Sequence, residues 1–315
     1  MAGKNVFLFG GQGSAVYQMG LELYNEYEDF KRIMDEFEDI YQKEMGFSLL
    51  NEIFKKENKK PLDDITFTHP GIFAVEYALF SCLSKKIYPD LLLGSSLGEF
   101  SSMAASGIIS KEEGFLSVIE QARLIKNSHI KGELISVFLK KRDFLKLEDE
   151  IDAEIVANNC SKILILATLN SNEKKVKEFI TNNKMMIFET NVHFPFHSSY
   201  IDSMKEQFTD KISKKLSLKP GNIPILSCSK ECQTLEYKRE DIWNIIRNPM
   251  NLPQIIENNI EKSDLILDLS PNSMMEVFVK DILGRDTRIK GICKIAGSSL
   301  KRLEDILNIY QKEFC

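Results

Sequence analysis

An apolar run at Leu91–Leu93 leads directly into a glycine-flanked serine turn, G-S-S-L-G, over residues 94–98. Residues 97–106 beyond it have the apolar spacing of a helix. A buried strand, a sharp turn and a helix in this order form one unit of an α/β sheet. Glycines at both flanks let the chain turn tightly enough to push the Ser96 hydroxyl outward, although a serine here could also simply cap the helix. The turn also places the Leu97 N–H at a helix N-terminus, where it can stabilise an oxyanion.

Strand-like runs alternate with amphipathic helical segments through much of the rest of the chain. Residues 5–9 predict a strand, and residues 20–41 predict a helix. Residues 70–83 predict a second helix, with Pro70 in its first turn. This alternation predicts an α/β architecture with a mostly parallel sheet.

A different rhythm begins near residue 133 and ends near residue 192. Its order is β-α-β-β-α-β, with elements expected at 134–139, 142–150, 154–158, 162–168, 172–181 and 185–190. This order is the ferredoxin-like arrangement. We therefore predict a small domain over residues 131–192, inserted into a large domain made of residues 1–130 and 193–315.

Composition excludes several classes of protein. The 315 residues, 43% of them hydrophobic, can bury a large core, and the net charge of −5 gives no support for nucleic-acid binding. No apolar run reaches the roughly 18–20 residues of a membrane span. The six cysteines are scattered, and the close pair Cys228 and Cys232 has no histidine beside it. We expect reduced thiols, no metal site and a cytoplasmic location.

A serine nucleophile needs a base, and the chain has four histidines. His69 precedes a proline, and His129 lies in a polar stretch that predicts a linker. His193 and His197 share one segment at the expected return to the large domain. Order and composition alone do not choose between these two.

Six short blocks occur in a fixed order along nearly the whole chain. They are F-G-G-Q-G-S at 9–14, T-H-P-G-I-F-A-V-E-Y at 68–77, G-S-S-L-G-E at 94–99, F-H-S at 196–198, N-P-M-N at 248–251 and L-S-P-N at 269–272. In this order they resemble the G-Q-G, T-Q-P, G-H-S-x-G-E, F-H-S, N-P-V and G-P-x blocks of one family. The chain thus resembles the malonyl-CoA:acyl-carrier-protein transacylases and the related acyltransferases of polyketide synthases.

The resemblance implies a hydrolase-like large domain with a ferredoxin-like insert, and it implies roles for single residues. His197 would be the base of a Ser–His dyad, oriented by a main-chain carbonyl near Asn251. The backbone amides of Gln12 and Leu97 would form the oxyanion hole. An acyl group would move from a thioester to Ser96 and then to an acceptor, without a cofactor. The implied partner is an acyl carrier protein, and acyl-CoA is a possible second one.

Two positions of the implied acyl pocket, which also includes Phe196, depart from the family. Ser95 stands where the family has histidine. The family arginine that holds the malonyl carboxylate lies 25 residues after the nucleophile, and an ungapped count from Ser96 arrives at Gln121. Arg123 is two residues further, about 200° around a helix, and is expected to point away. A neutral glutamine compensates a buried carboxylate poorly, so the pocket is predicted to favour uncharged acyl groups.

Members with this Arg-to-Gln change resemble the acyl hydrolases of trans-acyltransferase polyketide systems, which clear acyl groups from carrier proteins. The first hypothesis is such a hydrolase. The second is a malonyl- or other acyl-CoA:carrier-protein transacylase in which Arg123 or another group substitutes for the arginine. The third is a non-catalytic scaffold, which would have no need to retain Ser96, Gln12 and His197.

Overall fold

The structure is a computed structural model that describes residues 3–56, 61–145, 150–293 and 297–314. Its larger sheet has the strand order β11-β10-β1-β2-β7-β8. All neighbouring strands of this sheet run parallel except β7 and β8, which pair antiparallel at one edge. The bounds are β1 Asn5–Phe9, β2 Leu91–Gly94, β7 Ile225–Ser227, β8 Cys232–Thr234, β10 Leu265–Asp268 and β11 Ile289–Gly291. The predicted mostly parallel sheet is confirmed.

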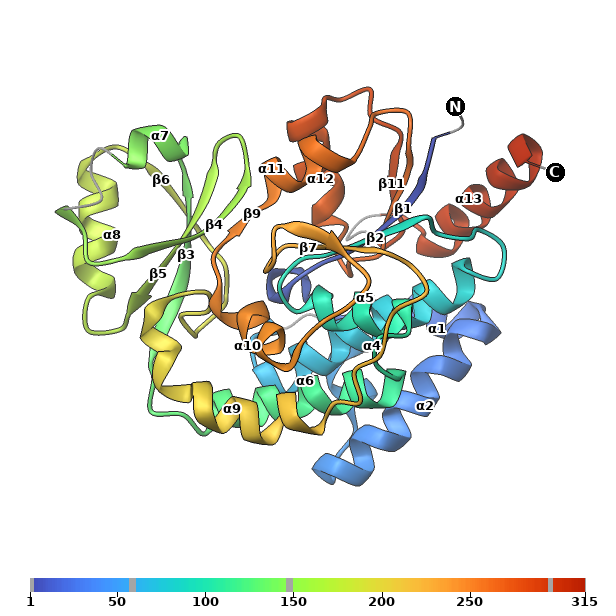
Figure 1. Ribbon diagram of the computed structural model, residues 1–315, viewed down its shortest axis with the longest axis horizontal. Helices are drawn as coiled ribbons and strands as arrows, with labels where there is room; N and C mark the ends of the chain where they lie inside the picture. Colours follow the sequence, from blue (N-terminus) through green and yellow to red (C-terminus); the bar gives the residue numbers. More distant parts are fainter. Residues whose placement is uncertain (1–2, 57–60, 146–149, 294–296, 315) are drawn as a thin grey trace.

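The central strands are apolar on both faces because helices cover both faces (Figure 1). Alternate residues of β1 divide between two cores, with Phe7 on one side and Val6 on the other. Helices α2 (Glu28–Met45), α4 (Ile65–Leu83), α5 (Gly98–Ser106) and α6 (Lys111–Lys126) contribute to the Phe7 core. Helices α11 (Leu252–Asn259) and α12 (Met274–Leu283) contribute to the Val6 core. Further α-helices outside the smaller sheet's segment are α1 (Leu21–Glu26), α3 (Leu49–Ile53), α9 (Lys205–Lys211), α10 (Arg239–Arg247) and α13 (Ser299–Phe314).

Helix α4 begins earlier than the sequence predicts. Asp64 caps it by accepting the Thr66 N–H at 3.0 Å, so that Pro70 lies inside the helix rather than in its first turn. A proline has no N–H, which leaves the carbonyl of Thr66 without its helical donor. The Tyr41 hydroxyl fills that role and donates to the Thr66 carbonyl at 2.8 Å. The single helix predicted over residues 20–41 is likewise two helices, because Tyr27 is extended with φ −126°.

The smaller sheet confirms the ferredoxin-like insert, seen on the left of Figure 1. Its strands follow the order β6-β3-β5-β4-β9, and the first four pair antiparallel. The bounds are β3 Gly132–Phe138, α7 Lys141–Phe144, β4 Glu154–Cys160, β5 Ile163–Leu169, α8 Glu173–Asn182, β6 Met186–Glu189 and β9 Met250–Asn251. The helix predicted over 142–150 ends at Phe144, and residues 146–149 lie outside the described part.

Strand β9 was not predicted. It comes from the large domain and pairs parallel with β4 of the insert, with Ala157 opposite Met250 and Asn158 opposite Asn251. The Asn158 side chain also donates to the Asn251 side chain at 3.1 Å. Backbone and side-chain hydrogen bonds therefore join the insert to the segment that follows α10. The domain bounds 1–130, 131–192 and 193–315 stay a prediction.

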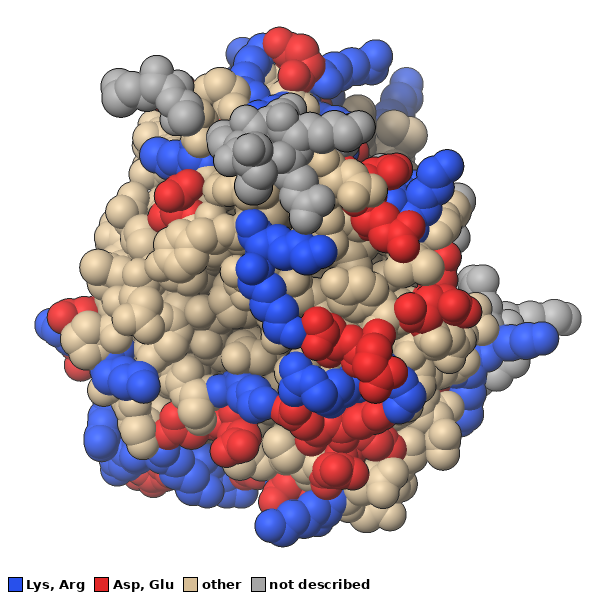
Figure 2. All heavy atoms as spheres, turned by 90° about the vertical axis from the view of Figure 1, so that its right-hand side faces the viewer, with Lys and Arg blue, Asp and Glu red and all other residues tan. Residues whose placement is uncertain are grey.

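The surface mixes charges of both signs. Figure 2 shows lysine and arginine side chains interspersed with acidic ones over one face of the molecule, as the sequence indicates. In the described ranges, no helix combines the length and the apolar character that a membrane crossing requires.

Candidate active site

Ser96 lies in a strained turn between β2 and α5. Its φ is +55°, in the left-handed region that a residue with a side chain enters at roughly 1–3 kcal/mol. The flanking Gly94 and Gly98 do not take positive φ. They permit close packing instead: a Cβ on Gly94 would lie 2.6 Å from the Glu99 Cα, and one on Gly98 would lie 2.4 Å from the Phe9 carbonyl oxygen. The sequence thus places the strain on the serine itself.

A buried carboxylate stabilises the turn through hydrogen bonds. Glu99, in the first turn of α5, accepts hydrogen bonds from the Ser227 hydroxyl, the Ser229 N–H and hydroxyl, and the Tyr237 hydroxyl, at 2.7–3.0 Å. Burial raises the pKa of Glu99, and these hydrogen bonds oppose that rise. The turn is consequently fixed to the end of β7 and to the chain that follows it.

His197 is the histidine that meets Ser96. The Ser96 Oγ and the His197 Nε2 are 2.8 Å apart. On the other side of the ring, Nδ1 lies 2.9 Å from the Asn248 carbonyl oxygen. Because a carbonyl only accepts, Nδ1 carries the proton and Nε2 is left free to take one from the serine. His197 is also held at φ +64°, and its N–H donates to the Ile246 carbonyl at 2.8 Å.

The orienting carbonyl therefore belongs to Asn248, at the end of α10, and the prediction that assigned this role near Asn251 is corrected. Asn251 lies in β9, where its side chain contacts Asn158 and Gln254. Sequence similarity located the block N-P-M-N but not the member of it that faces the imidazole. The end of α10 decides this, because it leaves the Asn248 carbonyl outside the helix.

Burial sets the charge of the base. Desolvation lowers the pKa of His197 from its ordinary value near 6.5 to about 4, with a smaller opposing contribution from the Asn248 carbonyl and a further lowering by Arg247. His197 is accordingly neutral at neutral pH, as a general base must be. By contrast, His193 and His129 are exposed, and His193 lies 3.5 Å from Asp63.

The first loop lies beside the serine. A Cβ on Gly11 would lie 3.2 Å from the Ser96 Cβ, and the Gly10 N–H donates to the buried Glu76 carboxyl at 2.5 Å. Burial raises the pKa of Glu76 well above its ordinary value. Among the described residues, the backbone N–H groups of Gln12 and Leu97 have no hydrogen-bond acceptor. Both remain available to an oxyanion on the acyl carbon.

Comparison with known proteins identifies the family of the chain. The family model for the acyl transferase domain matches residues 6–312. The chain belongs to the acyltransferase family. It is 33% identical over 289 residues to the polyketide biosynthesis acyltransferase homolog PksD of Bacillus subtilis, with 90% of this chain and 88% of PksD covered. It is 29% identical over 297 residues to the homolog BaeD of Bacillus velezensis, with 91% and 90% covered.

The fold is that of solved acyltransferases. One similar structure is the malonyl-CoA:acyl carrier protein transacylase of Helicobacter pylori, with a TM-score of 0.83, 18% identity and 100% of both chains covered. At this identity the likeness shows the fold alone. The family nevertheless makes this acyltransferase an acyl-transfer enzyme, which goes against the scaffold hypothesis.

The predicted pocket residues lie near the dyad of the acyltransferase. Gln121, on α6, is buried, and its Nε2 is 3.0 Å from the His69 Nε2. The His69 ring stacks on Phe196 with centroids 5.8 Å apart, and Phe196 directly precedes His197. Burial lowers the pKa of His69 to about 3, so its ring is uncharged at neutral pH. The contact between His69 and Gln121 was not predicted.

Arg123 turns away from this region, as predicted. Its guanidinium contacts the carbonyl oxygen of Glu44 and lies 3.4 Å from the carboxylates of Glu44 and Glu120. Ser95 is buried, and its hydroxyl is 3.8 Å from the Met250 sulfur.

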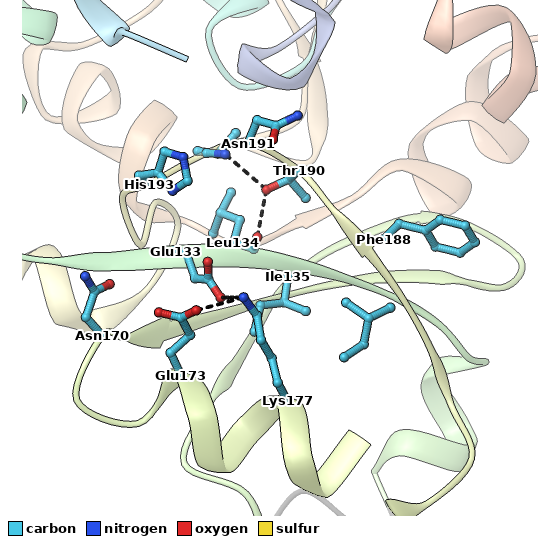
Figure 3. A pocket seen from close by; sticks show the side chains of 12 residues that line it. Glu133, Leu134, Ile135, Asn170, Glu173, Lys177, Phe188, Thr190, Asn191 and His193 are labelled. Carbon is cyan, nitrogen blue, oxygen red and sulfur yellow. Dashed lines mark hydrogen bonds and ion pairs between the residues drawn. The ribbon is translucent and has the colours of Figure 1, made fainter. Parts of the chain in front are cut away.

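A cavity of about 380 Å³ lies in the insert of the acyltransferase rather than at the dyad. Lys177 points between Glu133 and Glu173 there, at 2.8 Å from each carboxylate (Figure 3). His193 lines this cavity, but none of the predicted site residues does. Across the described ranges, no group of three or more histidine, cysteine or acidic side chains is arranged to hold a metal ion.

Proposed function

We propose that this acyltransferase is an acyl hydrolase of polyketide biosynthesis, which removes non-malonyl acyl groups from acyl carrier protein through an acyl-Ser96 intermediate. The names of PksD and BaeD, polyketide biosynthesis acyltransferase homologs, support the pathway. The single observation that carries the substrate class is the neutral pair of Gln121 and His69 at the position where the resemblance expects an arginine.

Charge is the reason for this choice. A malonyl carboxylate in a buried site needs a charged partner, and losing such a partner weakens binding by about 3–5 kcal/mol, a few hundredfold or more. Gln121 offers neutral hydrogen bonds, His69 is uncharged, and Arg123 pairs with Glu44 and Glu120 instead. An acetyl or longer uncharged acyl group makes no such demand.

The reaction follows from the positions of the side chains. The Ser96 oxygen attacks the thioester carbon while His197 Nε2 takes the hydroxyl proton, and the Gln12 and Leu97 amides donate to the oxyanion. Cleavage of the C–S bond releases the carrier thiol, which leaves with the proton from His197. Water then attacks the Ser96 ester and gives a proton to Nε2. That proton returns to Ser96 as the carboxylic acid departs. The Asn248 carbonyl holds the ring through both steps.

The second candidate is an acyl-CoA:carrier-protein transacylase, in which a carrier thiol replaces water. The chemistry at Ser96 and His197 is the same, so the dyad does not separate the two functions. The similarity in fold to malonyl-CoA:acyl carrier protein transacylase supports this second candidate.

The test is mass spectrometry of carrier protein loaded with acetyl or malonyl groups and incubated with the enzyme without another acceptor. The proposal expects rapid loss of acetyl, with malonyl spared and both groups retained by S96A. If both thioesters persist while malonyl moves from malonyl-CoA to free carrier protein, the enzyme is a transacylase.

A substitution pair tests the role of Gln121 separately. Q121R should raise the ratio of malonyl to acetyl turnover by roughly tenfold or more, because it restores a charged partner. R123Q is the matched control, and it should leave the ratio unchanged because the Arg123 guanidinium turns toward Glu44 and Glu120. An unchanged ratio in Q121R would count against Gln121 as an acyl-pocket residue.

A further inference from the structure

We propose that the side chain of Asn248 is a positioning group of the active site, because it holds in place the main-chain carbonyl that orients the His197 imidazole. The inference rests on the proposed acylation of Ser96, a step that the hydrolase and the transacylase share. It therefore does not depend on whether water or a thiol accepts the acyl group.

The orienting group is a main-chain carbonyl just past the end of α10. Asn248 has φ −76° and ψ 139°, which is the extended backbone that a residue before a proline favours, and Pro249 follows it. The carbonyl lies 2.9 Å from His197 Nδ1. A carbonyl at the end of a helix has no helical donor, so its position depends on what holds the residue that carries it.

Two further hydrogen bonds hold Asn248. Its backbone N–H donates to the Asn244 carbonyl at 2.9 Å, inside α10. Its side-chain Nδ2 donates to the Ser229 carbonyl at 3.1 Å. Because a carbonyl only accepts, the amide nitrogen and not the amide oxygen must face Ser229. The side chain thus attaches the orienting residue to a second part of the chain, outside its own helix.

Ser229 is itself held by the carboxylate that stabilises the nucleophile turn. Its N–H and its hydroxyl donate to the Glu99 carboxylate at 2.7 and 3.0 Å. Glu99 is fully buried, and its backbone N–H donates to the Ser96 carbonyl at 2.9 Å. The bond from Asn248 to Ser229 therefore connects the support of the base to the support of the nucleophile.

These hydrogen bonds close a ring that begins and ends at Ser96. The ring passes in turn through Glu99, Ser229, Asn248 and His197, whose Nε2 lies 2.8 Å from the Ser96 Oγ. In a Ser–His–Asp triad a carboxylate orients the imidazole through a charge-assisted hydrogen bond. A neutral carbonyl binds the ring more weakly, so its exact position matters more and the Asn248 side chain supplies it.

The first experiment measures acylation of Ser96 by acetyl-loaded carrier protein in a single turnover. N248A keeps the main-chain carbonyl and removes only the amide that holds it. Because a small misplacement of a catalytic group is costly, N248A should slow acylation by roughly 10- to 100-fold. N251A is the matched control, since Asn251 contacts Asn158 and Gln254 instead of Ser229, and it should acylate at the wild-type rate.

The second experiment observes the imidazole directly by ¹⁵N NMR. The chain has four histidines, so the His197 signals are assigned by their loss in H197Q. Wild type should carry the ring proton on Nδ1, whereas N248A should exchange between the two tautomers, because the acceptor at Nδ1 is no longer fixed. A general loss of stability would not change the tautomer of a folded protein.

An N248A rate equal to that of N251A would overturn the proposal, and so would an unchanged His197 spectrum in folded N248A. Thermal unfolding shows whether each variant is folded. If N248A does not fold, N248D decides by the same two criteria, because it keeps the size of the side chain but, when ionised, has no donor for the Ser229 carbonyl. If wild type is not acylated at all, the proposed function fails, while the tautomer spectra still decide the role of Asn248.

Discussion

The low pKa of His197 predicts that acylation of Ser96 stays fast in mild acid. The imidazole is buried, which lowers its pKa to about 4, and only the neutral ring can take the serine proton. At pH 5.5 such a ring is ~97% neutral, whereas a ring with the ordinary pKa of 6.5 would be only ~9% neutral. The acylation rate at pH 5.5 should therefore stay within roughly 10% of its value at pH 7.5, instead of falling about tenfold.

The assay is rapid-quench acylation of Ser96 by acetyl-loaded carrier protein from pH 4.5 to 8 at constant ionic strength, with circular dichroism to show that the fold persists. H193N is the matched control, because His193 is exposed and lies at Asp63 instead of Ser96. Its profile should overlay that of wild type. An acid limb centred near pH 6.5 in wild type, or a shifted limb in H193N, would refute the assignment of a buried His197 as the base.

Three further predictions concern stability. G98A should lower the free energy of unfolding by about 1–3 kcal/mol or more and slow acylation, because its Cβ would lie 2.4 Å from the Phe9 carbonyl oxygen. The control is G13A, whose Cβ would meet no atom within 4 Å, and its midpoint in urea unfolding should equal that of wild type. Y41F should lose about 1–3 kcal/mol in the same assay, because the Thr66 carbonyl then has no donor; an unchanged midpoint would contradict this. The folded-state pKa of His197 lies below its unfolded value, so its stabilising contribution is full above about pH 6.5 and falls as the pH drops toward 4. H197Q should therefore lose about 2 kcal/mol less stability than wild type between pH 7.5 and 5, and equal losses would refute the shift.

Sequence patterns predicted those strands and helices that depend on residues close together in the chain. The strand at Leu91–Gly94 and the helix after Ser96 follow from a short apolar run, two glycines and helical spacing, all within about 15 residues. The order of strands and helices in the insert was also predictable from the sequence, because each element has its own apolar periodicity. Strand β9 was missed because two residues give no pattern.

Tertiary contacts explain the other differences. The helix was predicted to begin too late, at Pro70, because the hydrogen bond that this proline cannot make is replaced by one from Tyr41, 25 residues before the Thr66 carbonyl. The choice between His193 and His197 needed the resemblance, and the change from Asn251 to Asn248 needed the end of α10. The contact between His69 and Gln121 joins two helices across 52 residues of sequence, and no local sequence pattern predicts it.

The most direct test of the central claim follows the acyl group on the enzyme itself. Acetyl-loaded carrier protein is mixed with the enzyme, quenched at short times, digested and analysed by peptide mass spectrometry. The account predicts an acetyl group on Ser96 that appears and then decays in buffer without an added acceptor, with no adduct in S96A. An acetyl group on another residue, or no adduct while S96A still clears the thioester, would contradict it.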